Sequence, residues 1–166
     1  EKERALERMV AAGVQPNAAT WNTVIAGYSS VAEKERALER MVAAGVQPNA
    51  DTWNGIIAGY SSGAEKERAL ERMVAAGVRP IAATWNGIIA GYSSGAEKER
   101  VLERMVAAGV QPNATTWTNV IAGYSSGAEK ERALERMVAA GVQPNADTWC
   151  WVIAGYSSGA ERERAL

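Results

Sequence analysis

The chain has 166 residues, a net charge of −1 and 47% hydrophobic residues, with no Phe or His. These totals lack the excess of positive charge that is common in nucleic-acid-binding domains. The single cysteine, Cys150, excludes an internal disulfide framework, and no apolar run approaches the ~18 residues of a membrane span.

A 32-residue sequence repeat runs through the chain, marked by tryptophans at that spacing: Trp21, Trp53, Trp85, Trp117 and Trp149. A period between ~20 and ~50 residues indicates a repeat array, in which each unit buries its apolar face on its neighbours. We therefore predict a single array over residues 1–166. It consists of a partial repeat at 1–17, full repeats at 18–49, 50–81, 82–113 and 114–145, and a partial repeat at 146–166.

The residue pattern in the first half of each repeat predicts a helix. Its apolar residues have the spacing of one helical face: Trp21, Val24, Ile25 and Tyr28. Asn17 or Thr20 is expected to cap its start. Gly27 is expected to lie inside this helix and to permit the close approach of a neighbouring helix. The repeating tryptophans are expected in the core rather than in a ladder that stacks on bases.

The residue pattern in the second half of each repeat predicts another helix, which is expected to begin near Ala32 after a break at Ser29 and Ser30. Its expected buried side is apolar: Ala37, Leu38, Met41, Val42 and Ala44. Its expected outer face carries charges that cancel within the repeat: Glu33, Lys34, Glu35, Arg36, Glu39 and Arg40. Gly45 is expected to stop the helix, and Pro48 prevents its continuation. Each repeat is therefore predicted to be a helical hairpin.

The sequence resembles the pentatricopeptide repeat family over essentially its whole length. The resemblance rests on Thr-Trp-Asn-Thr-Val-Ile-Ala-Gly-Tyr at 20–28, on Leu38 and Met41, and on Gly-Val-Gln-Pro-Asn at 45–49. The family's usual repeat is slightly longer, and the shortfall here falls around the start of the second helix. The tetratricopeptide family is the competing interpretation, but bulky Ile25 stands where that family has a small residue.

The resemblance implies an all-α fold, a right-handed α-solenoid of stacked helix-turn-helix hairpins. It also implies binding of single-stranded RNA, with about one base read per repeat by two or three side chains. One reader lies on the first helix, at positions that we call helix readers: Asn22, Asn54, Asn86, Thr118 and Cys150. A second reader ends the repeat, at the repeat-end positions: Asn17, Asn49, Ile81, Asn113 and Asn145. A third residue sandwiches the base, at the base-sandwich positions: Ala19, Asp51, Ala83, Thr115 and Asp147.

Family analogy gives the repeats different base preferences. Pairs of two asparagines imply a pyrimidine, namely Asn22 with Asn49 and Asn86 with Asn113. Thr118 with Asn145 implies adenine, whereas Ile81 deprives Asn54 of a polar partner and Cys150 is a poor reader. Asp51 and Asp147 place negative charge beside the expected phosphates, so weak RNA binding is expected. Only Arg79 adds a positive charge outside the second helices.

A second functional hypothesis is a structural scaffold subunit that binds proteins within a larger assembly. The near-neutral charge and the two aspartates favour it. Trp151 stands where other repeats have Thr23, Gly55, Gly87 or Asn119, so we expect it to be exposed and to contact protein. Both ends of the chain stop within a repeat and are expected to continue or to dock on partners.

No catalytic site, metal site or cofactor is predicted. Gly-x-Ser-x-Gly recurs around Ser61, Ser93, Ser125 and Ser157, but a nucleophile elbow needs a preceding strand and a histidine base, and the chain has no histidine. No Cys/His cluster suits zinc. A location in mitochondria or plastids is implied by the family resemblance alone.

Overall fold

The computed structural model describes residues 1–156; the rest of the last partial repeat, including Ser157, lies outside this range. The described residues form ten α-helices and no strand, which confirms the predicted all-α fold. None of these helices is long and apolar enough to cross a membrane. Contacts between helices divide the chain into two compact units, Glu1–Pro80 and a second that begins at Ile81. The single array over 1–166 stays a prediction.

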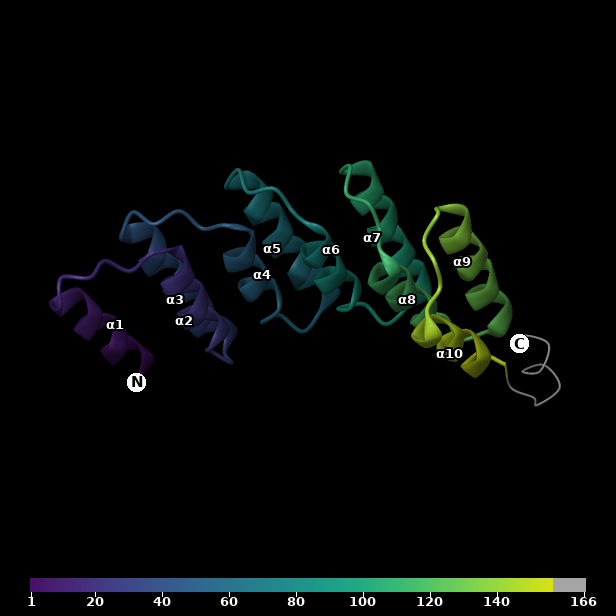
Figure 1. Ribbon diagram of the computed structural model, residues 1–166, viewed down its shortest axis with the longest axis horizontal. Helices are drawn as coiled ribbons and strands as arrows, with labels where there is room; N and C mark the ends of the chain where they lie inside the picture. The colour runs from purple at the N-terminus through teal and green to yellow at the C-terminus, as the bar shows by residue number, and fades with distance from the viewer. Residues whose placement is uncertain (157–166) are drawn as a thin grey trace. The chain divides into compact units, whose positions relative to one another are not determined.

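The first unit contains five helices that alternate between the two predicted types (Figure 1). The first helix of a repeat packs against the second, so that α2 pairs with α3 and α4 pairs with α5. The first helices α2 and α4 also contact each other, and α3 contacts α4. The bounds are α1 Lys2–Ala11, α2 Ala18–Ala26, α3 Val31–Ala43, α4 Ala50–Ile57 and α5 Gly63–Ala75.

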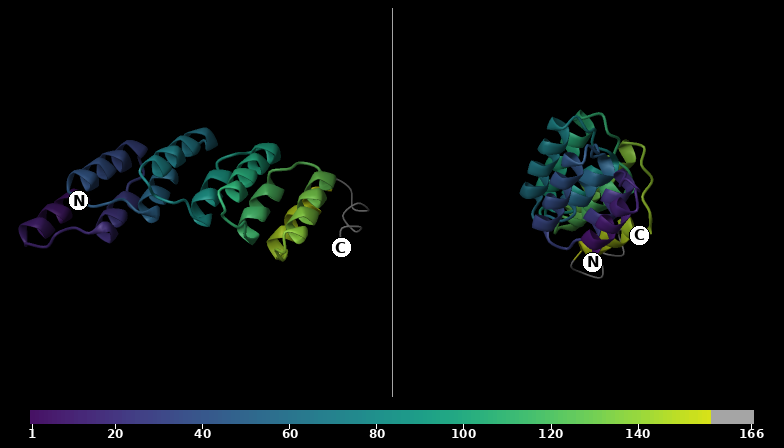
Figure 2. Two further views of the ribbon diagram at one scale, coloured as in Figure 1. Left: turned by 90° about the horizontal axis from the view of Figure 1, so that it is seen from above. Right: turned by 90° about the vertical axis from the view of Figure 1, so that its left-hand side faces the viewer.

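The second unit repeats this arrangement. Here α6 pairs with α7 and α8 pairs with α9, while the first helices α6, α8 and α10 contact one another in sequence (Figures 1 and 2). The bounds are α6 Ala82–Ile89, α7 Gly95–Ala107, α8 Ala114–Ala122, α9 Gly127–Ala139 and α10 Ala146–Ala154. Each complete repeat is a helical hairpin, as predicted.

Most first helices begin with a capping box. In α2, Thr20 N–H donates to Asn17 Oδ1 at 3.0 Å, and Asn17 N–H donates to Thr20 Oγ1 at 3.4 Å. The same pair of residue types begins α4, α8 and α10. α6 is the exception among these helices, because Ile81 has no side-chain acceptor. Thr84 N–H donates instead to the Ile81 backbone carbonyl at 3.0 Å.

Each second helix ends at a glycine, as predicted. Gly45 has φ +75°, a left-handed conformation that strains any residue with a β-carbon. Its N–H donates to Val42 O at 3.0 Å, and Val46 N–H donates to Met41 O at 3.1 Å. These two bonds form the Schellman motif that closes a helix. The same left-handed glycine occurs at Gly13, Gly77, Gly109 and Gly141.

The core of each hairpin lies between its two helices. Ile25 and Met41 are both fully buried, and Trp21 is 4% exposed. The expected burial of Val42 and Ala44 is wrong: Val42 is 56% exposed, and Ala44 is exposed too. The buried stripe of α3 is narrower than predicted and runs through Lys34, Ala37, Leu38 and Met41. Val42 lies beside this stripe, where no helix covers it.

The burial of Lys34 is the largest departure from the expected outer face. Lys34 is 6% exposed, and its Nζ donates to Gly55 O in the next repeat at 3.0 Å. In the second unit, Lys98 Nζ donates to Asn119 O at 3.0 Å. Both carbonyls lie in the last turn of a first helix, where backbone carbonyls lack partners within the helix. A second helix therefore caps the C-terminal end of the next repeat's first helix.

Glycines allow the backbones of successive hairpins to approach each other closely. Gly27 lies at the C-cap of α2 rather than inside the helix as predicted. Gly123 occupies the same place in α8, and a β-carbon there would lie 3.0 Å from both the N and the Cα of Gly95. Gly95 N–H donates to Gly123 O at 2.9 Å. The close approach of two backbones that was expected at Gly27 therefore occurs at Gly123, whereas a β-carbon at Gly27 would meet only the Lys2 side chain.

Three ion pairs join successive repeats. Arg40 pairs with Glu3 at 3.0 Å, Arg72 pairs with Glu35 at 2.7 Å, and Arg136 pairs with Glu99. Tyr60 Oη also donates to Glu35 Oε1 at 2.8 Å. The charges cancel in number, as the sequence indicates, but the ion pairs connect one second helix to the next.

Candidate nucleic-acid interface

The predicted RNA-contact residues gather at the N-terminal ends of the first helices. Each repeat-end residue is the N-cap, the base-sandwich residue is the second residue of the helix, and the helix reader lies one turn further along. All described repeat-end and base-sandwich residues are exposed. The helix readers are half-buried, except for Cys150, which is exposed. The sites therefore form an accessible row of positions within each unit, most of them polar.

The first unit places one helix reader against its repeat-end partner. Asn22 Nδ2 donates to Asn49 Oδ1 at 3.2 Å, although 27 residues separate them. Thr52, the third residue of α4, donates through Oγ1 to Asn22 Oδ1 at 2.6 Å. The Thr52 N–H donates to Asn49 Oδ1 at 3.0 Å. One network thus connects the helix reader, the repeat-end residue and the start of the next helix.

The second unit contains the same network. Asn86 Nδ2 donates to Asn113 Oδ1 at 3.3 Å, and Thr116 Oγ1 donates to Asn86 Oδ1 at 2.6 Å. Thr52 and Thr116 are both completely buried. The sequence analysis missed these threonines as part of the site. The signal was present, because Asn-x-x-Thr spans the N-cap and first turn of every first helix except α6, whose N-cap is Ile81.

The repeat that contains Thr118 has a different arrangement. Thr118 Oγ1 lies 3.0 Å from Thr148 Oγ1, and either hydroxyl can donate. Thr148 also approaches Asn145 Oδ1, with N–H and Oγ1 both at 2.9 Å. Among the described residues, no hydrogen bond joins Thr118 directly to Asn145. This helix reader is therefore held through one hydroxyl rather than two amide contacts.

Ile81 is exposed, at 43%, and caps α6 without a side-chain hydrogen bond. Its predicted partner Asn54 is half-buried in α4 and belongs to the other unit. Asn54 is not without an interaction partner. The predicted pairing of Asn54 with Ile81 stays a prediction.

Charge at the site is weakly negative. Asp51 and Asp147 are exposed in the first turns of α4 and α10. A carboxylate at a helix N-terminus is favoured by the helix dipole, but it opposes an approaching phosphate. Lys34 and Lys98 are buried against backbone carbonyls, and Arg72 is paired with Glu35. Much of the positive charge is therefore committed to contacts between repeats.

Four of the five repeating tryptophans are buried, at 4% exposure: Trp21, Trp53, Trp85 and Trp117. Arginines of the second helices lie over three of the rings, with Arg72 5.5 Å from the Trp53 centroid. These rings are core and form no stacking ladder. Trp149 departs from the prediction at 42% exposure. The second half of its repeat lies outside the described residues.

Trp151 is 45% exposed, as predicted, and Lys130 Nζ lies 5.2 Å from its ring centroid. The cation contacts one face of the indole, so the ring is partly supported by its own unit. Its expected protein contact stays a prediction.

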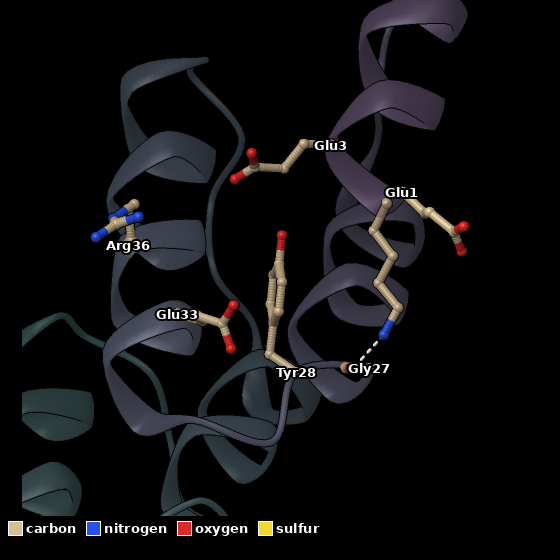
Figure 3. A pocket seen from close by; sticks show the side chains of 7 residues that line it. Glu1, Glu3, Gly27, Tyr28, Glu33 and Arg36 are labelled. Carbon is tan, nitrogen blue, oxygen red and sulfur yellow. Dashed lines mark hydrogen bonds between the residues drawn. The ribbon is translucent and has the colours of Figure 1, made fainter.

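A cavity of about 450 Å³ lies at the C-terminal end of α2, away from the predicted readers (Figure 3). Tyr28 stands between Glu3 and Glu33 in it, and Lys2 Nζ donates to Gly27 O. Burial and the nearby Glu3 raise the pKa of Tyr28.

The described residues contain no group of three or more Cys, Asp or Glu side chains that could hold a metal ion. The segments around Ser61, Ser93 and Ser125 follow helices rather than strands, so they lack the geometry of a nucleophile elbow.

The pentatricopeptide repeat domain, as a sequence profile, matches residues 4–62 and 100–158, well over half of the chain. The chain belongs to the pentatricopeptide repeat family. This membership decides between the two helical-repeat families that the sequence analysis considered. No curated protein sequence gives a significant match.

Solved pentatricopeptide repeat structures are similar along the chain. The crystal structure of PPR10 from maize is 29% identical with a TM-score of 0.75, covering 98% of this chain and 25% of PPR10. PPR10 in complex with an 18-nt psaJ RNA element is 26% identical with a TM-score of 0.81, covering 99% of this chain and 26% of that chain. The chain thus spans about a quarter of the PPR10 chains it matches.

A more distant similarity shows the fold alone. The pentatricopeptide domain of Arabidopsis thaliana protein-only RNase P 1, in complex with tRNA, is 18% identical with a TM-score of 0.64. The match covers 87% of this chain and 83% of that domain. The helical-repeat solenoid predicted from the sequence is confirmed by these structures.

Proposed function

We propose that the chain is a non-enzymatic module that binds single-stranded RNA through the N-terminal ends of its first helices, with about one base per repeat. The observation that carries this proposal is the pairing of helix reader and repeat-end residue. In each unit, a helix reader lies beside the repeat-end residue that caps the next first helix: Asn22 beside Asn49, and Asn86 beside Asn113. An unstacked base can be read there by hydrogen bonds to its Watson–Crick edge.

Similarity to an RNA-bound relative supports the proposal. The PPR10 complex that contains an RNA element aligns with almost all of this chain at a TM-score of 0.81. The base-sandwich positions, such as Ala19 and Thr115, are exposed beside the readers, where a base could be held. Contact between these residues and RNA is the part that needs an experiment.

The two kinds of repeat present different hydrogen-bonding groups. In the Asn22–Asn49 pair, both amide oxygens accept hydrogen bonds within the network, so the groups left for a base are N–H donors, which suit the acceptors of uracil or cytosine. When Thr148 donates to Asn145, Thr118 donates to Thr148 and offers an acceptor, while the Asn145 amide offers a donor. A donor beside an acceptor suits the edge of adenine. These preferences agree with those implied by family analogy.

The test is selection of bound sequences from a random single-stranded RNA pool, at low and at moderate salt, with the purified chain. We expect weak binding and a shallow salt dependence, because log affinity falls by roughly 0.7 per phosphate contact per decade of salt for single strands. Pyrimidines should be enriched opposite the two Asn–Asn pairs and adenine opposite Thr118.

A Thr118→Asn variant provides the matched comparison. It should change the enriched base at one position from adenine to a pyrimidine and leave the other positions unchanged. Absence of RNA binding even at low salt would refute the proposal and leave the protein scaffold as the working hypothesis. Binding with no base preference, unaffected by this substitution, would refute the proposed base readers.

A further inference from the structure

We infer that Thr52 and Thr116 are positioning residues that set the base preference of the preceding repeat. Each holds the amide oxygen of a helix reader, so that one hydrogen of the NH₂ group donates to the repeat-end residue and the other is available to a base. This inference rests on the proposed function for its consequence, but the orientation of the amide can be tested without RNA.

The hydroxyl of Thr52 has one hydrogen and two nearby acceptors. Its Oγ1 lies 2.6 Å from Asn22 Oδ1 and 3.0 Å from Asn49 Oδ1. Asn49 Oδ1 already receives the Thr52 N–H at 3.0 Å and Asn22 Nδ2 at 3.2 Å. Asn22 Oδ1 is the closer acceptor and has no other donor among the described residues. The Thr52 hydroxyl hydrogen therefore goes to Asn22.

The opposite orientation of the Asn22 amide is disfavoured at both of its atoms. After a flip, the Asn22 oxygen would face Asn49 Oδ1, where its nitrogen now lies at 3.2 Å. Two acceptors would then oppose each other, the Asn22 oxygen would lose its donor, and the Thr52 hydroxyl could donate only to Asn49 Oδ1, which already receives the Thr52 N–H. A buried polar group without a partner is costly, so the network selects one orientation.

Burial confines the threonine to an indirect role. Thr52 and Thr116 are completely buried, so RNA cannot reach either side chain. The same geometry occurs independently in the second unit, where Thr116 Oγ1 lies 2.6 Å from Asn86 Oδ1. The groups that remain outward are amide hydrogens of the helix reader and of the repeat-end residue. Within the described part of the chain, the Asn49 amide nitrogen has no hydrogen-bond acceptor.

Thr20 is a matched control within the same molecule. It occupies the same position in α2 and makes the same capping contacts with Asn17. Within the described part of the chain, its side chain bonds to Asn17 and to no helix reader. Thr20→Val therefore removes a capping hydroxyl of the same kind, whereas Thr52→Val removes the capping hydroxyl and the contact to Asn22.

The first experiment uses the purified chain without RNA. Side-chain amide resonances of Asn22 and Asn86 are recorded by ¹⁵N NMR in the parent and in the T20V, T52V and T116V variants. T52V should shift the Asn22 amide signals and speed their hydrogen exchange several-fold, while leaving Asn86 unchanged; T116V should do the converse. T20V should change neither. An Asn22 signal that is unchanged in a folded T52V variant would overturn the inference.

The second experiment repeats the RNA pool selection with the same variants. T52V should reduce the pyrimidine preference opposite Asn22 several-fold and leave the preference opposite Asn86 intact. Thr52→Ser keeps the hydroxyl and should restore the parent preference, which separates the orienting role from a general loss of stability. If T52V alters the Asn22 amide but not the base preference, the inferred control of specificity is wrong. If the parent enriches no sequence, base reading itself fails, and the NMR result still decides whether Thr52 orients the amide.

Discussion

The two ends of each first helix are stabilised in opposite ways. At the N-terminal end, Asn49 and Thr52 cap α4 from its own sequence, and the surrounding positions are exposed and differ between repeats. At the C-terminal end, Lys34 of the preceding repeat reaches Gly55 O from a buried position. One end can vary because its capping is local. The other is constrained because two repeats must fit together there.

The difference also separates recognition from assembly. Lys98 and the contact between Gly95 and Gly123 join successive hairpins, and equivalent lysines are present in every complete repeat. Substitutions at the C-terminal ends should therefore change stability. Substitutions at the N-terminal ends should change base preference with smaller effects on stability.

The largest effect is expected for Gly123→Ala. The added β-carbon would lie 2.7 Å from Lys98 Cδ and 3.0 Å from the N and Cα of Gly95, and the Gly95 backbone is less easily displaced than a flexible side chain. We expect the free energy of unfolding in urea to fall by about 2–3 kcal/mol. Gly27→Ala is the control, because its β-carbon would meet only the flexible end of Lys2. Equal effects of the two substitutions would contradict the proposed constraint.

A smaller loss is expected for Lys98→Met, which keeps the length of the side chain but removes the hydrogen bond to Asn119 O. Burial lowers the pKa of Lys98, so part of its interaction energy is already offset by desolvation. The free energy of unfolding should fall by about 1–2 kcal/mol. The exposed Arg132→Met on the next second helix serves as the control. A Lys98→Met variant as stable as the parent would show that the carbonyl needs no cap.

The contact of Glu35 with Arg72 and Tyr60 should make stability depend on pH. The hydrogen bond from Arg72 is the main cause that holds the pKa of Glu35 below its ordinary 4.5. A lowered carboxyl pKa stabilises the folded state above pH 4.5, and this contribution disappears as the pH falls through the folded pKa. As the pH falls below 4.5, Glu35→Gln should therefore lose less of its unfolding free energy than the parent. Exposed Glu39→Gln should follow the parent, and a Glu35→Gln acid profile equal to the parent's would reject the contribution.

The smallest effect, and the only gain, is expected for Ile81→Asn. The new side chain would supply the cap that α6 lacks and would remove an exposed apolar group. Thermal and urea unfolding should show a gain of up to about 1 kcal/mol. Ile81→Ala controls for loss of the apolar side chain alone. If alanine stabilises as much as asparagine, the missing cap is not what weakens this end of α6.

Local signals predicted much of this fold. Periodicity identified both helices, and Asn17 with Thr20 identified the cap, because such features depend on residues a few positions apart. The contact between Asn22 and Asn49 came from the family resemblance, since no local pattern links residues 27 positions apart. Lys34 was misplaced because a charged side chain is ordinarily exposed, and its carbonyl partner lies in the next repeat. Thr20 was recognised as a candidate cap, but its counterpart Thr52 was not recognised as a contact to Asn22, for the same reason.

The ion pairs between second helices also affect how such an array can lengthen. Glu35 and Arg72 occupy different positions within their repeats, and each repeat carries both residue types. Tandem duplication of one repeat in the gene therefore creates a new junction with both partners already in place. No compensating substitution is required when the number of repeats changes. The array can gain copies first and diverge later at Asn22, Thr118 and their counterparts.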